Sequence, residues 1–150
     1  MSVQWNFKLL NQFNEEEYQQ IYDMRDEIFA SGGEKDLGHP PMDEIDEYCY
    51  HSFSWGEEGL LAYCRVIQEG ENLYRIARVL VHKRARGQGM GQKLINFTCD
   101  QIKEYFNGKL VTLDALEYIH RMYLKVGFYL TGETTDFNGI PAVTMNKELQ

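Results

Sequence analysis

One stretch, "RVLVHKRARGQGMGQKLI" at residues 78–95, constrains the fold more than any other. Branched apolar residues run into a basic, glycine-rich turn, and apolar residues at helical spacing follow at once. The start of a helix leaves backbone N–H groups unpaired at the positive end of the helix dipole, so it can hold an anion. Three glycines remove the side chains that would keep a phosphate away: Gly87, Gly89 and Gly91. The stretch therefore predicts a strand, an anion-binding turn and a helix.

Two familiar phosphate-binding motifs do not match this turn. A P-loop needs Lys-Ser/Thr after its last glycine, but residues 91–94 read GQKL. A dinucleotide-binding turn reads G-x-G-x-x-G, whereas this chain has G-x-G-x-G with arginines before it. A tight strand-to-helix connection without any ligand remains the alternative.

The apolar periodicity predicts the remaining elements. Strands are expected at residues 3–10, 50–55, 59–68, 73–82, 109–115, 129–137 and 141–149. Helices are expected at residues 15–29, capped by Asn14, at 89–106 and at 117–128, with a short one within 42–49. Residues 30–41 collect glycine and proline and are expected to form a long, functional or mobile loop. This order predicts one α+β domain over residues 1–150, with helices on both faces of a mixed sheet.

Composition limits the kinds of partner that this chain is expected to bind. A formal net charge of −8 argues against nucleic acid and favours a cationic small substrate. The sequence has no signal-peptide pattern and no apolar run of about 18 residues, so we expect a cytoplasmic protein without a membrane partner. Cys49, Cys64 and Cys99 are odd in number and lack C-x-x-C spacing, which predicts reduced, mostly buried thiols. The histidines show no metal-ligand spacing, so no metal is expected.

Three segments carry a resemblance to a known family. "RGQGMG" at residues 86–91 matches R/Q-x-x-G-x-G/A, the pyrophosphate-binding signature of the GNAT N-acetyltransferases, and "MYLKVGF" resembles their "lYeklGF" segment. With "DFNGIPAVTM", these segments are most similar to the ElaA-like branch. The resemblance implies a seven-stranded, mostly antiparallel mixed sheet with a splayed central strand pair, and acetyl-CoA as cosubstrate.

The resemblance also implies the cofactor contacts. The backbone of Val79, Leu80 and Val81 would bind the pantetheine arm. The pyrophosphate would lie on the glycine-rich turn, formed by Arg86, Gly87, Gln88, Gly89, Met90 and Gly91. Many family members have an asparagine seven residues before the catalytic tyrosine, where this chain has Leu116. A side-chain contact to the pantetheine is therefore in doubt here.

For catalysis, the resemblance places Tyr123 as the general acid that protonates the leaving thiolate. Glu44 and Asp46, in the acidic segment "DEIDEY", are the candidate bases. His82, Glu117 and a chain of water molecules remain open as alternatives.

The activity implied is transfer of an acetyl group from acetyl-CoA to a primary amine, directly within a ternary complex, by a monomer or homodimer. The alternative is a CoA-binding regulatory module that has lost turnover.

Overall fold

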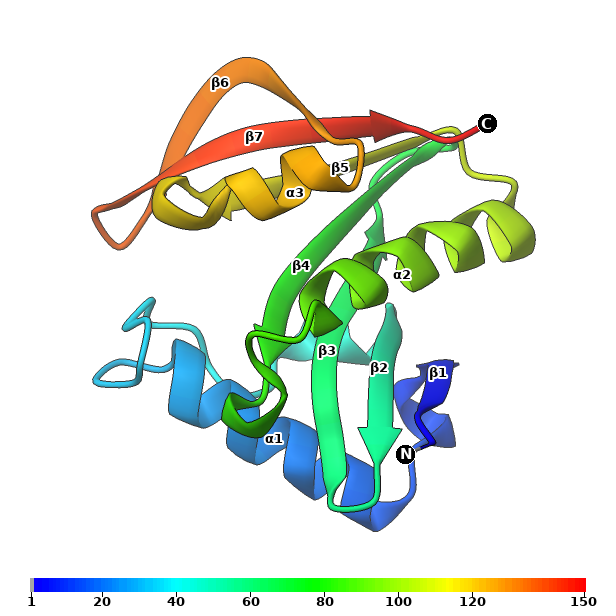
Figure 1. Cartoon of the computed structure of the whole chain (residues 1–150), viewed down its shortest axis with the longest axis vertical. Coiled ribbons are helices and arrows are strands. Elements are labelled where there is room, and N and C mark those ends of the chain that lie inside the picture. The colour runs from blue at the N-terminus through cyan, green and yellow to red at the C-terminus, as the bar shows by residue number, and fades with distance from the viewer. Residues whose placement is uncertain (1) are drawn as a thin grey trace.

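The computed structural model describes residues 2–150 and shows one seven-stranded sheet with strand order β1-β2-β3-β4-β5-β7-β6 (Figure 1). The strands are β1 Gln4–Leu9, β2 Tyr50–Gly56, β3 Gly59–Gln68, β4 Leu73–Val81, β5 Leu110–Leu116, β6 Tyr129–Phe137 and β7 Ile140–Glu148. The α-helices are α1 Glu15–Phe29, α2 Met90–Phe106 and α3 Arg121–Lys125. Neighbouring strands are antiparallel except for the parallel pair β4 and β5. The predicted mixed, mostly antiparallel sheet is confirmed.

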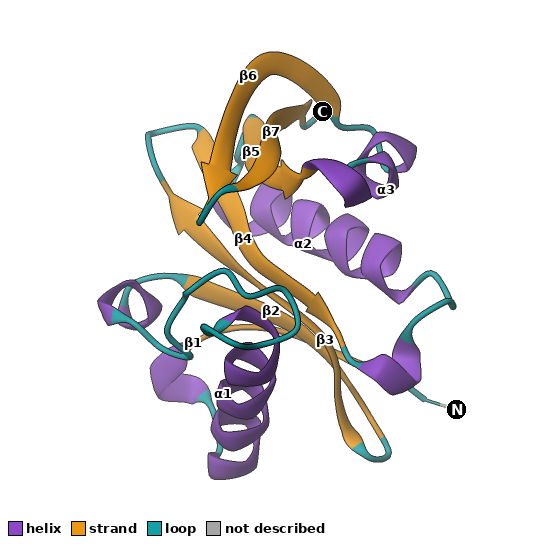
Figure 2. Cartoon of the chain, turned by 90° about the vertical axis from the view of Figure 1, so that its left-hand side faces the viewer, coloured by secondary structure: helices purple, strands orange, loops and turns teal. Residues whose placement is uncertain are grey.

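Helices α1 and α2 cover opposite faces of the sheet (Figure 2). Asn14 caps α1 as predicted: its Oδ1 accepts from the backbone N of Glu17 at 2.8 Å, and Glu17 accepts from the backbone N of Asn14 at 2.9 Å. Ile21 of α1 belongs to one buried apolar cluster and Leu94 of α2 to another. The sheet therefore lies between two cores, and each core holds one helix in place.

Strands β4 and β5 diverge soon after they begin. They pair only from Leu73–Arg75 to Leu110–Thr112. Further along, the pairing of β4 with β3 shifts register, and Arg78 takes a φ of +58°. Few non-glycine residues adopt a positive φ, so this bulge bends β4 away from β5 at a cost in strain. The predicted splay of the central strands is confirmed.

The predicted helix at residues 117–128 is wrong in extent. A 3-10 turn covers Glu117–Ile119, and only Arg121–Lys125 form the α-helix. Residues four apart share one face of a continuous α-helix, yet Ile119 packs against one core and Tyr123 belongs to the other. The break between the two turns allows both contacts. The short helix expected within residues 42–49 is also a 3-10 turn, at Glu44–Glu47.

Candidate active site

Two cavities adjoin where β4 and β5 diverge. The first, of about 310 Å³, lies against the end of α1, the loop at residues 30–41 and the β4–β5 gap. The second, of about 410 Å³, lies between β4, the 3-10 turn before α3 and Arg86. Lys35, Val79, Ile119 and Tyr123 line both cavities. A molecule that enters the second cavity therefore reaches the first at these four side chains.

The glycine-rich turn has the conformation that an anion cradle needs. Gly87 and Gly89 have φ values of +77° and +75°, and a Cβ added to either would meet no atom within 4 Å. Lys93 N makes the bond to Gly89 O at 3.1 Å, so the amides at the start of α2 have no partner within the helix. The space around Gly87 and Gly89 is open, as an anion site at these amides requires.

Other residues of the turn have structural reasons for their identity. A Cβ at Gly91 would lie 2.9 Å from Met122 Sδ, so this glycine is explained by the packing of α2 against α3. The Met90 side chain is buried in the core, and Gln88 donates to the carbonyl of Arg84 at 3.2 Å. At Met90 and Gly91, only backbone amides are available to a ligand.

Arg86 lies between the turn and the loop. Its Nε donates to the Val81 carbonyl at 2.9 Å, and its Nη1 and Nη2 donate to the two carboxylate oxygens of Glu34 at 2.6 and 2.8 Å. The hydrogen bond from Arg86 is the main reason that the pKa of Glu34 is lowered. A carboxylate thus holds the guanidinium group expected to contact the pyrophosphate.

The end of β4 offers backbone without a strand partner on the β5 side. Val79, Leu80 and Val81 lie beyond the last β4–β5 pair and line the second cavity. The Leu80 side chain is buried, and its pairing with Tyr63 on β3 uses the other edge of the strand. A chain of amides in this gap could bond to β4 as an added strand would.

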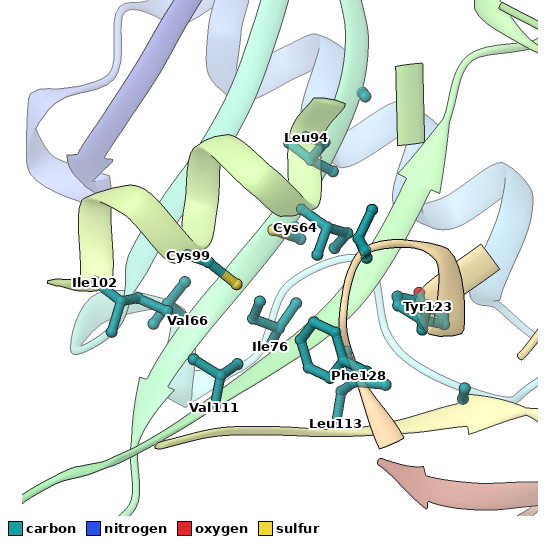
Figure 3. Close-up of a cluster of buried hydrophobic side chains, with 14 of the residues drawn as sticks. Cys64, Val66, Ile76, Leu94, Cys99, Ile102, Val111, Leu113, Tyr123 and Phe128 are labelled. Atoms are coloured by element: carbon teal, nitrogen blue, oxygen red, sulfur yellow. The ribbon is translucent and has the colours of Figure 1, made fainter. Parts of the chain in front are cut away.

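Tyr123 lies on α3 at the junction of the two cavities. Its ring is only 4% exposed and packs edge-on against Phe128, with centroids 6.0 Å apart (Figure 3). Burial raises the pKa of Tyr123 above its ordinary value, so the phenol keeps its proton at neutral pH. A protonated hydroxyl at this junction can serve as a proton donor.

The predicted bases lie outside the first cavity, as far as the described residues show. Asp46 is buried, and its Oδ1 accepts from Arg25 at 2.7 Å and from Arg65 at 3.1 Å. Glu44 and Glu117 are exposed, and His82 caps a 3-10 turn through a hydrogen bond from Arg84 N. In this geometry Asp46 holds two guanidinium groups, which leaves its carboxylate poorly placed to take a proton from a substrate.

Sequence reasoning missed the charged residues that line the first cavity, which include Lys35, His39, Arg65, Glu69, Arg75, Arg78 and Asp114. His39 has its pKa lowered to about 4 by burial and then by the nearby Arg78, so its imidazole is neutral at pH 7. No motif marks these side chains, because four different segments bring them together. The positive φ of Arg78 also has no signal in the pattern "LYRIARVLV".

The cysteines are free and buried, as predicted. Burial is the main reason that the pKa values of Cys49, Cys64 and Cys99 rise to about 12, which disfavours the thiolate that a nucleophile needs. Ligand atoms of Asp46, Cys49 and His51 lie within 4.8 Å of one another. The two arginines on Asp46 would repel a metal cation there, so the chemistry of this cluster does not favour one.

Comparison with known proteins places these features in a family. The family model "Acetyltransferase (GNAT) domain" matches residues 42–149. A UPF0039 protein of Schizosaccharomyces pombe is 33% identical over 150 residues, which cover 99% of each chain. The protein ElaA of Escherichia coli is 30% identical over 101 residues, or 66% of each chain.

Solved structures share the whole fold. Escherichia coli ElaA superposes with a TM-score of 0.85 at 22% identity and covers 98% of this chain and 100% of its own. An acyl-CoA N-acyltransferase of Pseudomonas aeruginosa has a TM-score of 0.85 at 25% identity, and the match covers 97% of this chain and 99% of that one. An aminoglycoside 6'-N-acetyltransferase solved with coenzyme A superposes with a TM-score of 0.74 at 16% sequence identity. The match covers 95% of this chain and 96% of that one. Among residues 2–150 no helix is long and apolar enough to span a membrane.

Proposed function

Because the chain belongs to the GNAT acetyltransferase family and to its ElaA-like branch, we propose that it transfers the acetyl group of acetyl-CoA to a primary amine. The observation that carries the proposal is the meeting of the two cavities at Tyr123. One cavity is lined by Arg86 of the glycine-rich turn and the other is not. The donor and the acceptor can therefore meet from opposite sides, which supports direct transfer in a ternary complex.

The pyrophosphate and the pantetheine of the donor each have a matching group on the protein. The amides at the start of α2 would hold the pyrophosphate, with Arg86 beside them. The edge of β4 at residues 79–81, which has no strand partner in β5 and whose Val81 carbonyl accepts from Arg86, would bind the pantetheine amides and aim the thioester at Tyr123. Leu116 stands where many relatives have an asparagine, so the donor relies on backbone contacts at that point.

The reaction joins the amine nitrogen to the thioester carbon and breaks the carbon–sulfur bond. Tyr123 gives its proton to the departing sulfur, since its phenol is protonated and lines both cavities. The amine has to arrive neutral and lose one proton after attack. We propose a chain of water molecules as the route for that proton. Asp46 is paired with arginines, Glu69 and Asp114 pair with Arg75, and a pKa of about 4 makes the His39 imidazole a weak base.

A thiol-release assay with acetyl-CoA and a panel of amines tests the proposal. The panel should contain polyamines, aminoglycosides, amino acids and short peptides. Release that depends on both acetyl-CoA and an amine, with a mass increase of one acetyl group on that amine, is expected. CoA binding without release from any acceptor would favour the alternative, a CoA-binding module without turnover.

We also propose a cytoplasmic location and a single domain over residues 1–150. Three free, buried cysteines fit a reducing compartment. The two apolar cores share the same sheet, so neither half of the chain has a separate framework.

A further inference from the structure

We propose that the first cavity selects an acceptor that carries a carboxylate as well as its amine, held by Arg78 and Arg65. The inference rests on the proposed acyl transfer and names the substrate class of that site. It departs from the simple cationic acceptor expected from the net charge of the chain. Its basis is an excess of positive charge behind the wall of the cavity that Arg65 and Arg78 form.

Three guanidinium groups meet two carboxylates behind this wall. Arg25 donates to Asp46 at 2.7 Å, and Arg65 donates to Asp43 at 2.8 Å and to Asp46 at 3.1 Å. Arg78 comes no closer than 3.7 Å to Asp43, through Nη2. Arg25, Arg65 and Asp46 are almost fully buried. One positive charge therefore remains in excess, and Arg78 has the weakest partner.

The guanidinium groups without a close partner are complementary to an anion. The Nε atoms of Arg65 and Arg78 are buried without a hydrogen-bond partner within residues 2–150, as are Nε and Nη2 of Arg25, and of these three arginines only Arg65 and Arg78 line the cavity. A buried charge without a partner is costly, and the planar fork of arginine matches a carboxylate. Arg78 is also held at a φ of +58°, a strain that functional sites often retain. A single carboxylate would balance the excess charge.

The same cavity also has an end with the opposite excess. Glu69 and Asp114 both pair with Arg75, and Asp114 accepts a further hydrogen bond from Thr144 at 2.6 Å. Two carboxylates thus share one guanidinium group, so this end attracts the acceptor's ammonium group on entry, and the amine then loses its proton before it attacks at Tyr123. A cavity with a positive and a negative end fits an amino carboxylate better than a polycation such as an aminoglycoside.

Matched substrate pairs test the inference without altering the protein. A series of ω-amino acids of increasing length is compared with alkylamines of the same length, whose amines have similar basicity. For the best length, kcat/KM should be at least about 10-fold higher with the carboxylate, the effect of a charge-assisted hydrogen bond. ω-Aminoalkyl phosphonates form a third arm. Equal use of alkylamines, or preference for the phosphonate, would overturn the carboxylate assignment.

Variants then locate the effect. Arg78→Met should remove most of the preference for the ω-amino acid over the alkylamine, and Arg78→Lys should retain part of that preference. Arg121→Met, on the surface of α3 and outside both cavities, is the matched control and should keep the full preference. An unchanged preference in folded Arg78→Met, or a loss in Arg121→Met, would overturn the placement. If neither class of amine releases thiol while CoA binds, the proposed function itself fails.

Discussion

Arg86 and Glu34 form a two-point ion pair that joins the glycine-rich turn to the loop at residues 30–41, with N–O distances of 2.6 and 2.8 Å. The same guanidinium group is the one proposed to contact the pyrophosphate. A carboxylate and a phosphate compete for the same donors, so the ion pair and the bound donor exclude each other in part. The contact between Arg86 and the loop should therefore weaken when CoA binds.

Replacing Glu34 should strengthen CoA binding. In Glu34→Gln the neutral amide competes less well for Arg86, so the Kd for CoA should fall. Because this ion pair is half-exposed, the decrease should be only about 2- to 5-fold. Calorimetry with CoA at low and moderate salt measures it. Glu104→Gln, exposed on α2, is the control and should leave Kd unchanged. Weaker binding in Glu34→Gln would mean that the carboxylate helps to place Arg86 instead of competing for it.

Replacing Gly89 should separate the cradle from backbone strain. Gly89→Val places a side chain in the open space before α2, and Kd for CoA should rise by about 10-fold or more. Gly139 in the β6–β7 turn has a φ of +88° and equally open space around a Cβ, so Gly139→Val carries similar strain outside residues 86–91. Both variants should lose thermal stability, and only Gly89→Val should lose affinity. A similar Kd in both would remove the cradle from the proposal.

Asp46 and Glu44 can be told apart by stability. Asp46→Asn leaves Arg25 and Arg65 buried with one fewer charge to balance them, so it should lower the free energy of unfolding by about 3 kcal/mol or more. Glu44→Gln changes an exposed side chain and should leave both stability and acetyl transfer nearly unchanged. Urea unfolding followed by the thiol-release assay measures both. A stable Asp46→Asn protein that loses only turnover would restore Asp46 as the base.

The sequence predicted the parts of the fold that depend on local patterns. Alternating strands, the Asn14 cap and the glycine-rich start of α2 each depend on neighbouring residues, and all three are found. The helix predicted before Gly127 was too long. Tertiary packing places Ile119 and Tyr123 on different cores and overrides a weak local preference for a continuous helix. Arg78 could not be foreseen, because a bulge at a non-glycine residue is imposed by the pairing of whole strands.

The candidate site also has parts that local patterns indicate and parts that they do not. The turn at residues 86–91 and Tyr123 could be proposed from the sequence because single segments carry them. The charged lining of the first cavity joins β3, β4, β5 and the loop, and no stretch of sequence contains that arrangement. The acidic segment "DEIDEY" looked like a source of bases because its carboxylates were judged without their partners. In the fold, Asp46 is buried and accepts hydrogen bonds from Arg25 on α1 and Arg65 on β3.

The hydroxyl of Tyr123 should matter for rate far more than for binding or folding. Tyr123→Phe keeps the buried ring and its contact with Phe128 but removes the proton donor at the junction of the cavities. Single-turnover acetyl transfer should slow by about 10²- to 10⁴-fold, the usual contribution of a positioned acid. The Kd for acetyl-CoA and the melting temperature should change little, since the lost interaction belongs to the transition state.

Tyr74→Phe provides the matched control for that change. Tyr74 is 3% exposed, close to the 4% of Tyr123, and lines neither cavity. Removing its hydroxyl should therefore leave the rate of transfer intact. If Tyr123→Phe turns over as fast as Tyr74→Phe, then Tyr123 serves only in packing. Protonation of the leaving sulfur would in that case have to come from water in the β4–β5 gap.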